Sequence, residues 1–144
     1  MSLETLFRLA NFVAVIGWIV LVPACLLGWE RGIDWICGSA IPTLLAAAYV
    51  VVIVAFWGGA RIDFSSLAGI MALFRQPAAA LAGWLHYLAF DMLVGVLLAR
   101  RMMQSRMPRL VVVPVLLLTF FAGPAGFLLH QAAMLARGGA KARR

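Results

Sequence analysis

Long apolar runs separated by short polar segments are the main pattern along this 144-residue chain. The runs cover residues 6–27, 36–57, 77–99 and 110–136. Each is long enough to cross a hydrocarbon core of about 30 Å as a helix that rises ~1.5 Å per residue. The pattern therefore predicts an all-α membrane protein with four transmembrane helices. Pro114 and the stretch 123–126 interrupt the last run, so we expect a break or kink near its middle.

A fifth apolar segment, residues 64–75, is too short to cross a membrane. Ser65 or Ser66 can cap a helix at its start, and Gln76 before Pro77 disfavours helix at its end. Apolar side chains recur in between at spacings of three and four residues: Leu67, Ile70, Met71 and Phe74. We expect a short interfacial or re-entrant helix between the second and third spans.

Composition agrees with this interpretation, because 65% hydrophobic residues and a mean hydropathy of +1.04 lie far outside the range of soluble domains. The formal net charge is +7. Since the basic residues lie in loops and in the tail, between apolar runs, they favour anionic lipid headgroups over nucleic acid as a partner. The sequence predicts one transmembrane four-helix domain, residues 1–136, followed by a basic flexible tail, residues 137–144.

Four crossings would place both termini on the same side of the membrane. That side would carry more basic residues than the other, so the positive-inside rule favours cytoplasmic termini in a bacterial inner membrane. The basic residues expected on the terminus side are Arg8, Arg61, Arg75, Arg137, Lys141, Arg143 and Arg144. Those expected on the other side are Arg31, Arg100, Arg101, Arg106 and Arg109.

The third run contains the most informative polar residues, His86 and Asp91, and has no Lys, Arg or Glu from residue 77 to 99. A charged group in mid-membrane costs roughly 2.5–3.5 kcal/mol on insertion scales, so such a residue is interpreted first as functional. A separation of five residues turns the two side chains about 140° apart on a helix. Asp91 therefore shares a face with Tyr87 and Trp84, whereas His86 shares a face with Phe90.

Two interpretations of these polar residues remain open. In the first, they line a cavity between the helices: Tyr49, His86, Tyr87, Asp91 and Thr119, with aromatic walls from Trp18, Trp84, Phe90, Phe120 and Phe121. In the second, His86 and Asp91 only hold helices together through hydrogen bonds to Asn11, Tyr49 and Thr119. Asn11 itself is either an interhelical clamp or a substrate contact.

Several other kinds of site find no support in the sequence. His86, Asp91 and His130 do not have a known metal-ligand spacing, so no metal site is predicted. The sequence has no glycine-rich phosphate loop, nucleophile elbow or dinucleotide motif, and we expect no cofactor. Cys25 and Cys37 are expected to be free and buried, although a disulfide stays open if that side of the membrane is oxidising.

Short motifs in a fixed order give the chain a family resemblance. They are LANF at 9–12, GW at 17–18, IP at 41–42, SLAG at 66–69, GWLHYLAFD at 83–91 and GPAG at 123–126. In these motifs the chain resembles the family named after plant abscisic acid deficiency, whose plant members are the neoxanthin synthases. It differs at Val96, where members of that family commonly carry an arginine.

The resemblance implies a four-helix membrane protein that acts on a xanthophyll, opening an epoxide of violaxanthin to form an allene without net redox change. Such a step needs an acid for the epoxide oxygen and a base for a polyene proton, in a dry apolar site. Our hypothesis is that protonated Asp91 is the acid and His86 the base, or the reverse, with Tyr87 assisting either. The expected substrate contacts are Asn11, Trp18, Tyr49, Trp84, Phe90, Thr119 and Pro124.

Two alternatives come from other functional classes. The chain would bind a carotenoid or another isoprenoid lipid without chemistry, or serve as a small subunit of a homo-oligomer or a membrane complex. Proton or ion translocation through Asp91 and His86 is weaker, because only two titratable groups lie along the path.

Overall fold

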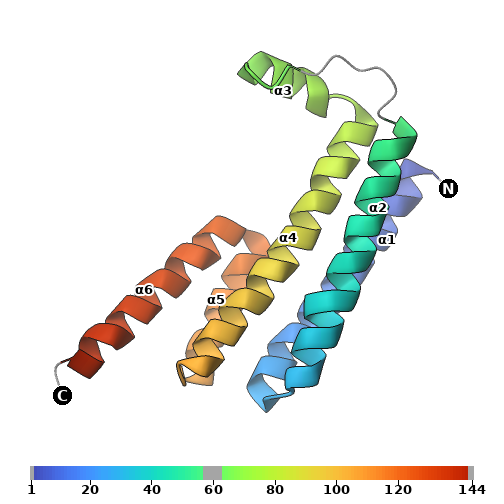
Figure 1. Cartoon of the computed structure of the whole chain (residues 1–144). Coiled ribbons are helices and arrows are strands. Elements are labelled where there is room, and N and C mark those ends of the chain that lie inside the picture. The colour runs from blue at the N-terminus through green and yellow to red at the C-terminus, as the bar shows by residue number, and fades with distance from the viewer. Residues whose placement is uncertain (1, 57–62, 143–144) are drawn as a thin grey trace.

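The computed structural model describes residues 2–56 and 63–142, and all the elements in these two ranges are helical. The predicted all-α class is therefore confirmed. The elements are α1 (Leu3–Leu27), η1 (Gly32–Ala40), α2 (Ile41–Phe56), α3 (Leu67–Phe74), α4 (Pro77–Gln104), α5 (Arg109–Phe121) and α6 (Gly123–Ala142). Figure 1 shows α1, α2 and α4 running alongside one another, with α3 lying across the start of α4.

Three helices in the described ranges are long and apolar enough to cross a membrane, which indicates an integral membrane protein. They are Leu3–Leu27, Gly32–Ala55 and Pro77–Gln104, and they correspond to the first three apolar runs. The second begins with the wider π-helical turns of η1, which end where Pro42, lacking an N–H group, enters α2. The predicted end of this span at Trp57 lies outside the described residues.

The structure replaces the predicted fourth crossing with a helical hairpin. The expected break is present, because α5 ends at Phe121 and α6 begins at Gly123. Beyond the break, however, α6 turns back along α5 and α4 (Figure 1). Gly123 lies against Asp91 in the middle of α4, whereas Met134 Sδ lies 3.5 Å from Oγ of Ser105, which follows the last turn of α4. Residues 110–136 thus do not form a single span.

The reversal of α6 separates the two ends of the described chain, which four crossings would have placed together. The start of α1 and the end of α6 lie at opposite ends of α4 (Figure 1). The turn is local in origin: Ala122 is extended, with φ −154° and ψ 81°, and its carbonyl then accepts the Gly126 N–H at 3.0 Å. Gly126 has no side chain to keep α6 away from Thr119, so the two helices approach closely. α6 continues to Ala142, so most of the predicted flexible tail is helical, and residues 143–144 lie outside the described ranges.

Small residues bring the spanning helices together. A Cβ atom on Gly17 would lie 2.5 Å from Cε of Met92, and one on Gly95 would lie 2.6 Å from the Trp18 ring. Each glycine therefore receives a large side chain from the neighbouring helix. Cys37 Sγ lies 3.4 Å from the Gly17 carbonyl oxygen. Both Cys25 and Cys37 are free and buried, as expected.

A short helix is present within residues 64–75, as α3, which confirms the helical part of the prediction. Ser66 is its N-cap, with Oγ accepting the Gly69 N–H at 3.0 Å. Asp63 supports the cap by accepting hydrogen bonds from the hydroxyl groups of Ser65 and Ser66, which lower the pKa of its carboxyl group to about 2. None of the residues of α3 is buried, which fits a helix lying at the membrane interface.

The Ser66 cap should contribute to the local stability of α3. Ser66→Ala should destabilise the first turn of α3 by about 1 kcal/mol, because the Gly69 N–H then loses its acceptor. Amide hydrogen exchange within α3 should accelerate about fivefold, while the midpoint of global unfolding stays unchanged because α3 buries no residue. Ser39→Ala is the matched control, since Ser39 is exposed and lies outside α3. Equal exchange rates in both variants would show that the cap contributes nothing.

Candidate functional site

Asp91 is one of three described residues with a buried polar side-chain atom that has no hydrogen-bond partner among the described residues; the others are His130 and Arg137. Asp91 is half-buried in the middle of α4, and the atom concerned is its Oδ2. The hairpin turn closes one side, because a Cβ atom on Gly123 would collide with Asp91 Oδ1. A buried polar atom with no partner calls for a ligand, a proton or a water molecule as its explanation. Asp91 is therefore the centre of the candidate site.

A row of polar and aromatic groups leads from Asp91 towards the start of α1. Tyr87 lies one turn earlier on the same face of α4, beside the Asp91 carboxyl group. Its ring centroid is 5.3 Å from that of Trp84. Trp84 Nε1 donates to Asn11 Oδ1 at 3.1 Å, and Asn11 Nδ2 donates to the Phe7 carbonyl oxygen at 2.7 Å. Asn11 thus acts as a clamp between α1 and α4.

The clamp can be tested by removing the Trp84 N–H group, which donates the hydrogen bond to Asn11. Trp84→Phe keeps an aromatic ring against Phe7 but removes the N–H that reaches Asn11. We expect a loss of about 0.6–1.5 kcal/mol in the free energy of unfolding, measured in detergent or bicelles. Trp35→Phe is the control, because Trp35 is 72% exposed. A Trp84→Phe variant as stable as this control would show that the hydrogen bond is not a clamp.

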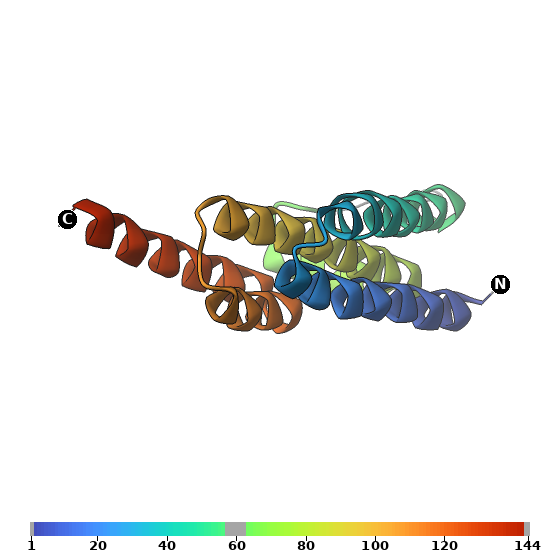
Figure 2. The ribbon, with the colours of Figure 1, turned by 90° about the horizontal axis from the view of Figure 1, so that it is seen from below.

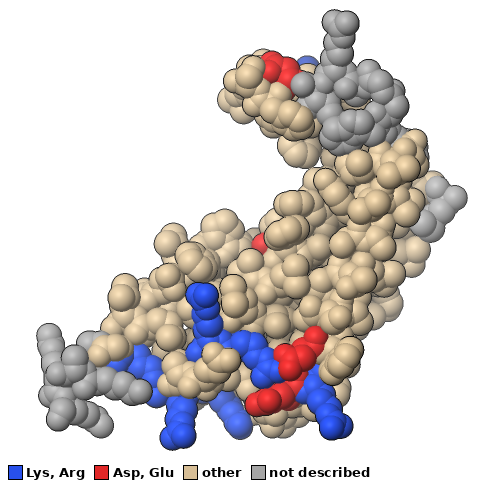
Figure 3. Space-filling model, in the orientation of Figure 1, with Lys and Arg blue, Asp and Glu red and all other residues tan. Residues whose placement is uncertain are grey.

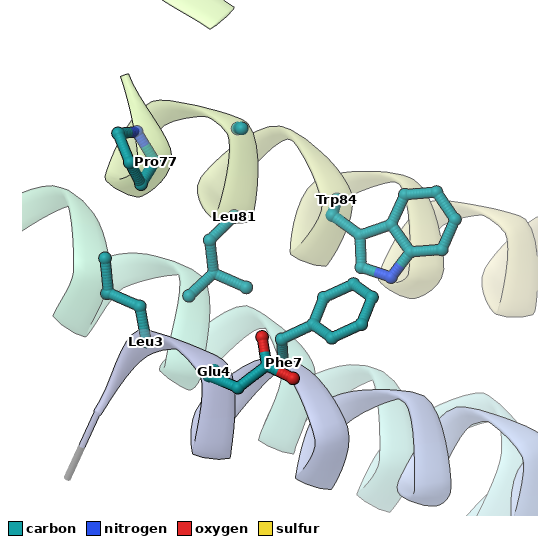
Figure 4. Close-up of a pocket in the computed structure, with 7 residues that line it drawn as sticks. Leu3, Glu4, Phe7, Pro77, Leu81 and Trp84 are labelled. Carbon is teal, nitrogen blue, oxygen red and sulfur yellow. The ribbon is translucent and has the colours of Figure 1, made fainter. Parts of the chain in front are cut away.

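A cavity of about 330 Å³ opens at the other end of this row, between the starts of α1 and α4. Figure 4 shows Phe7 and Trp84 side by side along it, with Leu3, Leu81 and Pro77 further along. The Phe7 and Trp84 ring centroids are 6.0 Å apart. Figure 2 shows α5 beside α1, and the hairpin turn stops at the level of Asp91. In the first half of α1 and α4, α5 and α6 therefore leave uncovered the face that carries Phe7 and Trp84, which are 39% and 40% exposed. An elongated apolar molecule could lie along this uncovered half with one end near Asp91.

His86 lies on a different face of α4. Its ring stacks on Phe90 at 4.5 Å and 20°, and its centroid is 6.0 Å from that of Tyr49 in α2. Tyr49 and His86 also line a second cavity of about 250 Å³, which lies beneath α3 and includes Phe74. The two polar patches therefore face different neighbours, as the helical geometry predicts. His86 lines the cavity beneath α3 and Asp91 does not, and α4 continues unbroken between the two residues.

The remaining predicted contacts lie on α1, α5 and α6. The hydroxyl group of Thr119 is buried and donates to the Val115 carbonyl oxygen at 2.7 Å within its own helix. Trp18 packs edge-on against Phe120, with centroids 5.5 Å apart. Pro124 is exposed at the hairpin turn, next to Gly123. Within residues 2–56 and 63–142, no group of three or more His, Cys, Asp or Glu side chains could hold a metal ion.

Sequence reasoning missed one feature of this site, the space that Gly123 provides, and one buried histidine outside it, His130. The sequence predicts Gly123 only as a helix breaker, but its missing side chain makes room for the Asp91 carboxyl group. His130 is 1% exposed, and its Nε2 atom is buried without a partner among the described residues. The GPAG motif at 123–126 carried the signal for the first feature. The sequence gives no signal for the second, because burial of His130 depends on the reversal of α6.

Comparison with known protein families identifies the family of this chain. A family model described as ABA DEFICIENT 4-like (ABA4-like) matches residues 5–130. The chain belongs to this family. The residues that match the ABA DEFICIENT 4-like model include Asp91, His86 and the hairpin turn between α5 and α6, and the match ends within α6. Among curated proteins and among solved structures, no match to the chain is found.

Proposed function

We propose that this membrane protein binds an epoxy-xanthophyll and isomerises it, with Asp91 as the proton donor. The observation that carries the proposal is the buried Oδ2 atom of Asp91, in the middle of an apolar span, which has no hydrogen-bond partner in the part of the chain that the structure describes. Membership of the ABA DEFICIENT 4-like family supports the substrate class, because the plant proteins that the motifs resemble are neoxanthin synthases. The bacterial inner membrane is the location that we propose with it.

The chemistry needs only proton transfers. A proton reaches the epoxide oxygen as its C–O bond breaks, and another proton leaves a polyene carbon as the allene forms. Protonated Asp91 gives the first proton, and the carboxylate that results accepts the second, so the residue returns to its starting state. Atoms and electrons balance without any co-reactant. Apolar surroundings favour the neutral acid and exclude water from the reactive intermediate.

Neighbouring residues have distinct roles in this proposal. Tyr87, beside the Asp91 carboxyl group, orients the oxygen of the substrate. Trp84 and Phe7 provide aromatic surface for the polyene along the uncovered half of α1 and α4. His86 stays a predicted base, although it would reach the same substrate only if the ligand wrapped around α4. One residue on the Asp91 face is sufficient for the chemistry.

Binding without chemistry is the second candidate, and the cavity beneath α3 favours it. This cavity of about 250 Å³ has apolar walls and presents Tyr49 and His86 as its polar groups. A ring that carries a hydroxyl group would fit these walls. In this alternative the protein holds a carotenoid or another isoprenoid, either alone or as the small subunit of a membrane complex.

Expression in a host that accumulates violaxanthin separates the two candidates. The full chain is purified in mild detergent, and its pigments are extracted and resolved by chromatography and mass spectrometry. We expect neoxanthin in cells that carry the protein and none in cells with an empty vector. Unchanged violaxanthin that copurifies with the protein would instead support binding without chemistry. If the pigment neither copurifies nor changes, the proposed function is wrong.

A further inference from the structure

Arginine side chains gather at one end of the helix bundle, which Figure 3 shows as the blue region. They come from four separate segments that the fold brings to the same level. The members are Arg31 after α1, Arg100 and Arg101 near the end of α4 with Arg106 in the turn that follows it, Arg109 at the start of α5, and Arg137 in α6. We call these six residues the arginine end. At the opposite end, the described basic residues are Arg8 and Arg75.

Acidic residues neutralise little of this charge. Glu30 and Asp34 both pair with Arg100, Glu30 at 3.6 Å from Nη1 and Asp34 at a shorter separation from Nη2. In the described part of the chain, the other members of the arginine end have no carboxylate within ion-pair distance. At the opposite end, Arg8 is paired with Glu4 at 2.8 Å. The excess positive charge therefore lies at one end of the bundle.

The surroundings of the arginine end are those of a membrane interface. Trp29 and Trp35 lie in the same region and are 49% and 72% exposed, as expected for an aromatic belt at the headgroup level. None of the cavities described here, between α1 and α4, beneath α3, or along α1 with α2 and α5, is lined by these arginines. A broad ring of cations around the helix ends complements a layer of negative headgroups.

We propose that the arginine end lies among the anionic phospholipid headgroups of the cytoplasmic leaflet. Three crossings and a hairpin then place the end of α6 in the cytoplasm and the start of α1 on the opposite side. This arrangement differs from the one predicted from four crossings, in which both termini are cytoplasmic. The inference does not depend on the proposed enzymatic function, since it uses only the helix topology and the charges.

Reporter fusions to the full chain test the topology. A fluorescent protein that folds only in the cytoplasm, fused after residue 144, should fluoresce, and a phosphatase that is active only outside the inner membrane should be inactive there. The same pair fused before residue 1 should give the reverse result. Both ends on one side would overturn the three-crossing topology. Ends on opposite sides with the arginine end outside would overturn its contact with the cytoplasmic leaflet.

A charge variant tests the headgroup contact itself. The protein is reconstituted in bilayers of phosphatidylglycerol and phosphatidylcholine in equal parts, and the lipids that stay bound are counted by native mass spectrometry. The wild type should retain phosphatidylglycerol in preference to phosphatidylcholine. In the variant R101Q/R106Q/R109Q, the ratio of bound phosphatidylglycerol to bound phosphatidylcholine should fall by up to about fivefold for each arginine replaced. The control variant R8Q/R75Q changes two arginines at the other end and should keep it. Equal retention of the two lipids by the wild type, or an unchanged preference in the triple variant, would overturn the proposal.

Discussion

Asp91→Asn should lower the rate of xanthophyll conversion by about 10²–10⁴-fold, the range that one acid–base group contributes. Asparagine has nearly the same shape, so the variant should keep its fold and its place against Gly123, but an amide has no acidic proton for the epoxide oxygen. The measurement is the rate of neoxanthin formation by purified protein in lipid nanodiscs. An Asp91→Asn variant that turns over at the wild-type rate would contradict the assignment.

His86→Gln is the informative companion to this variant. Because His86 lies on a different face of α4, stacked on Phe90, the one-carboxyl mechanism predicts a change of less than about tenfold. The hypothesis of an acid and a base on separate residues predicts a loss comparable to that of Asp91→Asn. Equal losses in the two variants would therefore require the substrate to contact both faces of α4. Tyr87→Phe should give an intermediate loss through poorer orientation of the substrate oxygen.

Gly123→Ala should have the second largest effect, acting on both stability and activity. A Cβ atom at this position would overlap Asp91 Oδ1, so either the carboxyl group or the hairpin turn must move. Overpacking of this kind costs typically 1–3 kcal/mol, measured as the free energy of unfolding in bicelles. Conversion should also fall at least tenfold, because the displaced carboxyl group no longer meets the substrate at the same place.

Gly138→Ala is the matched control within the same helix. A Cβ atom on Gly138 meets nothing within 4 Å, and the position is exposed. Alanine there should stabilise α6 by about 0.5–1 kcal/mol through its higher helix propensity and leave conversion unchanged. If Gly123→Ala behaved like Gly138→Ala, the close contact between the hairpin turn and Asp91 would not exist in the folded protein.

The hydrophobic pattern was sufficient to predict three spans and the short helix α3, because length and apolar content decide whether a helix crosses a membrane. It could not distinguish one broken span from a hairpin over residues 110–136. Both arrangements have the same composition and the same break at Gly123. The direction of the chain after the break depends on contacts across the turn, such as that between Thr119 and Gly126, which no local pattern encodes.

The candidate site, like the fold, could be predicted from the sequence only in part. Helical geometry alone separated His86 from Asp91 and grouped Trp84 and Tyr87 with the carboxylate, because that depends only on the residues per turn. The predicted common cavity would have required a kink in α4, and α4 runs unbroken from Pro77 to Gln104. The partner on the other side of Asp91, Gly123, is 32 positions later in the chain and is brought there by the hairpin.

We propose above all that Asp91 carries its proton at a site that a lipid-soluble substrate occupies. Reaction with a lipid-soluble carbodiimide, which modifies protonated carboxyl groups, tests it directly when the modified peptide is quantified by mass spectrometry. We predict that Asp91 is labelled in nanodiscs without pigment and that violaxanthin slows the labelling at least tenfold. No labelling of Asp91, or labelling at the same rate with and without violaxanthin, would contradict the claim.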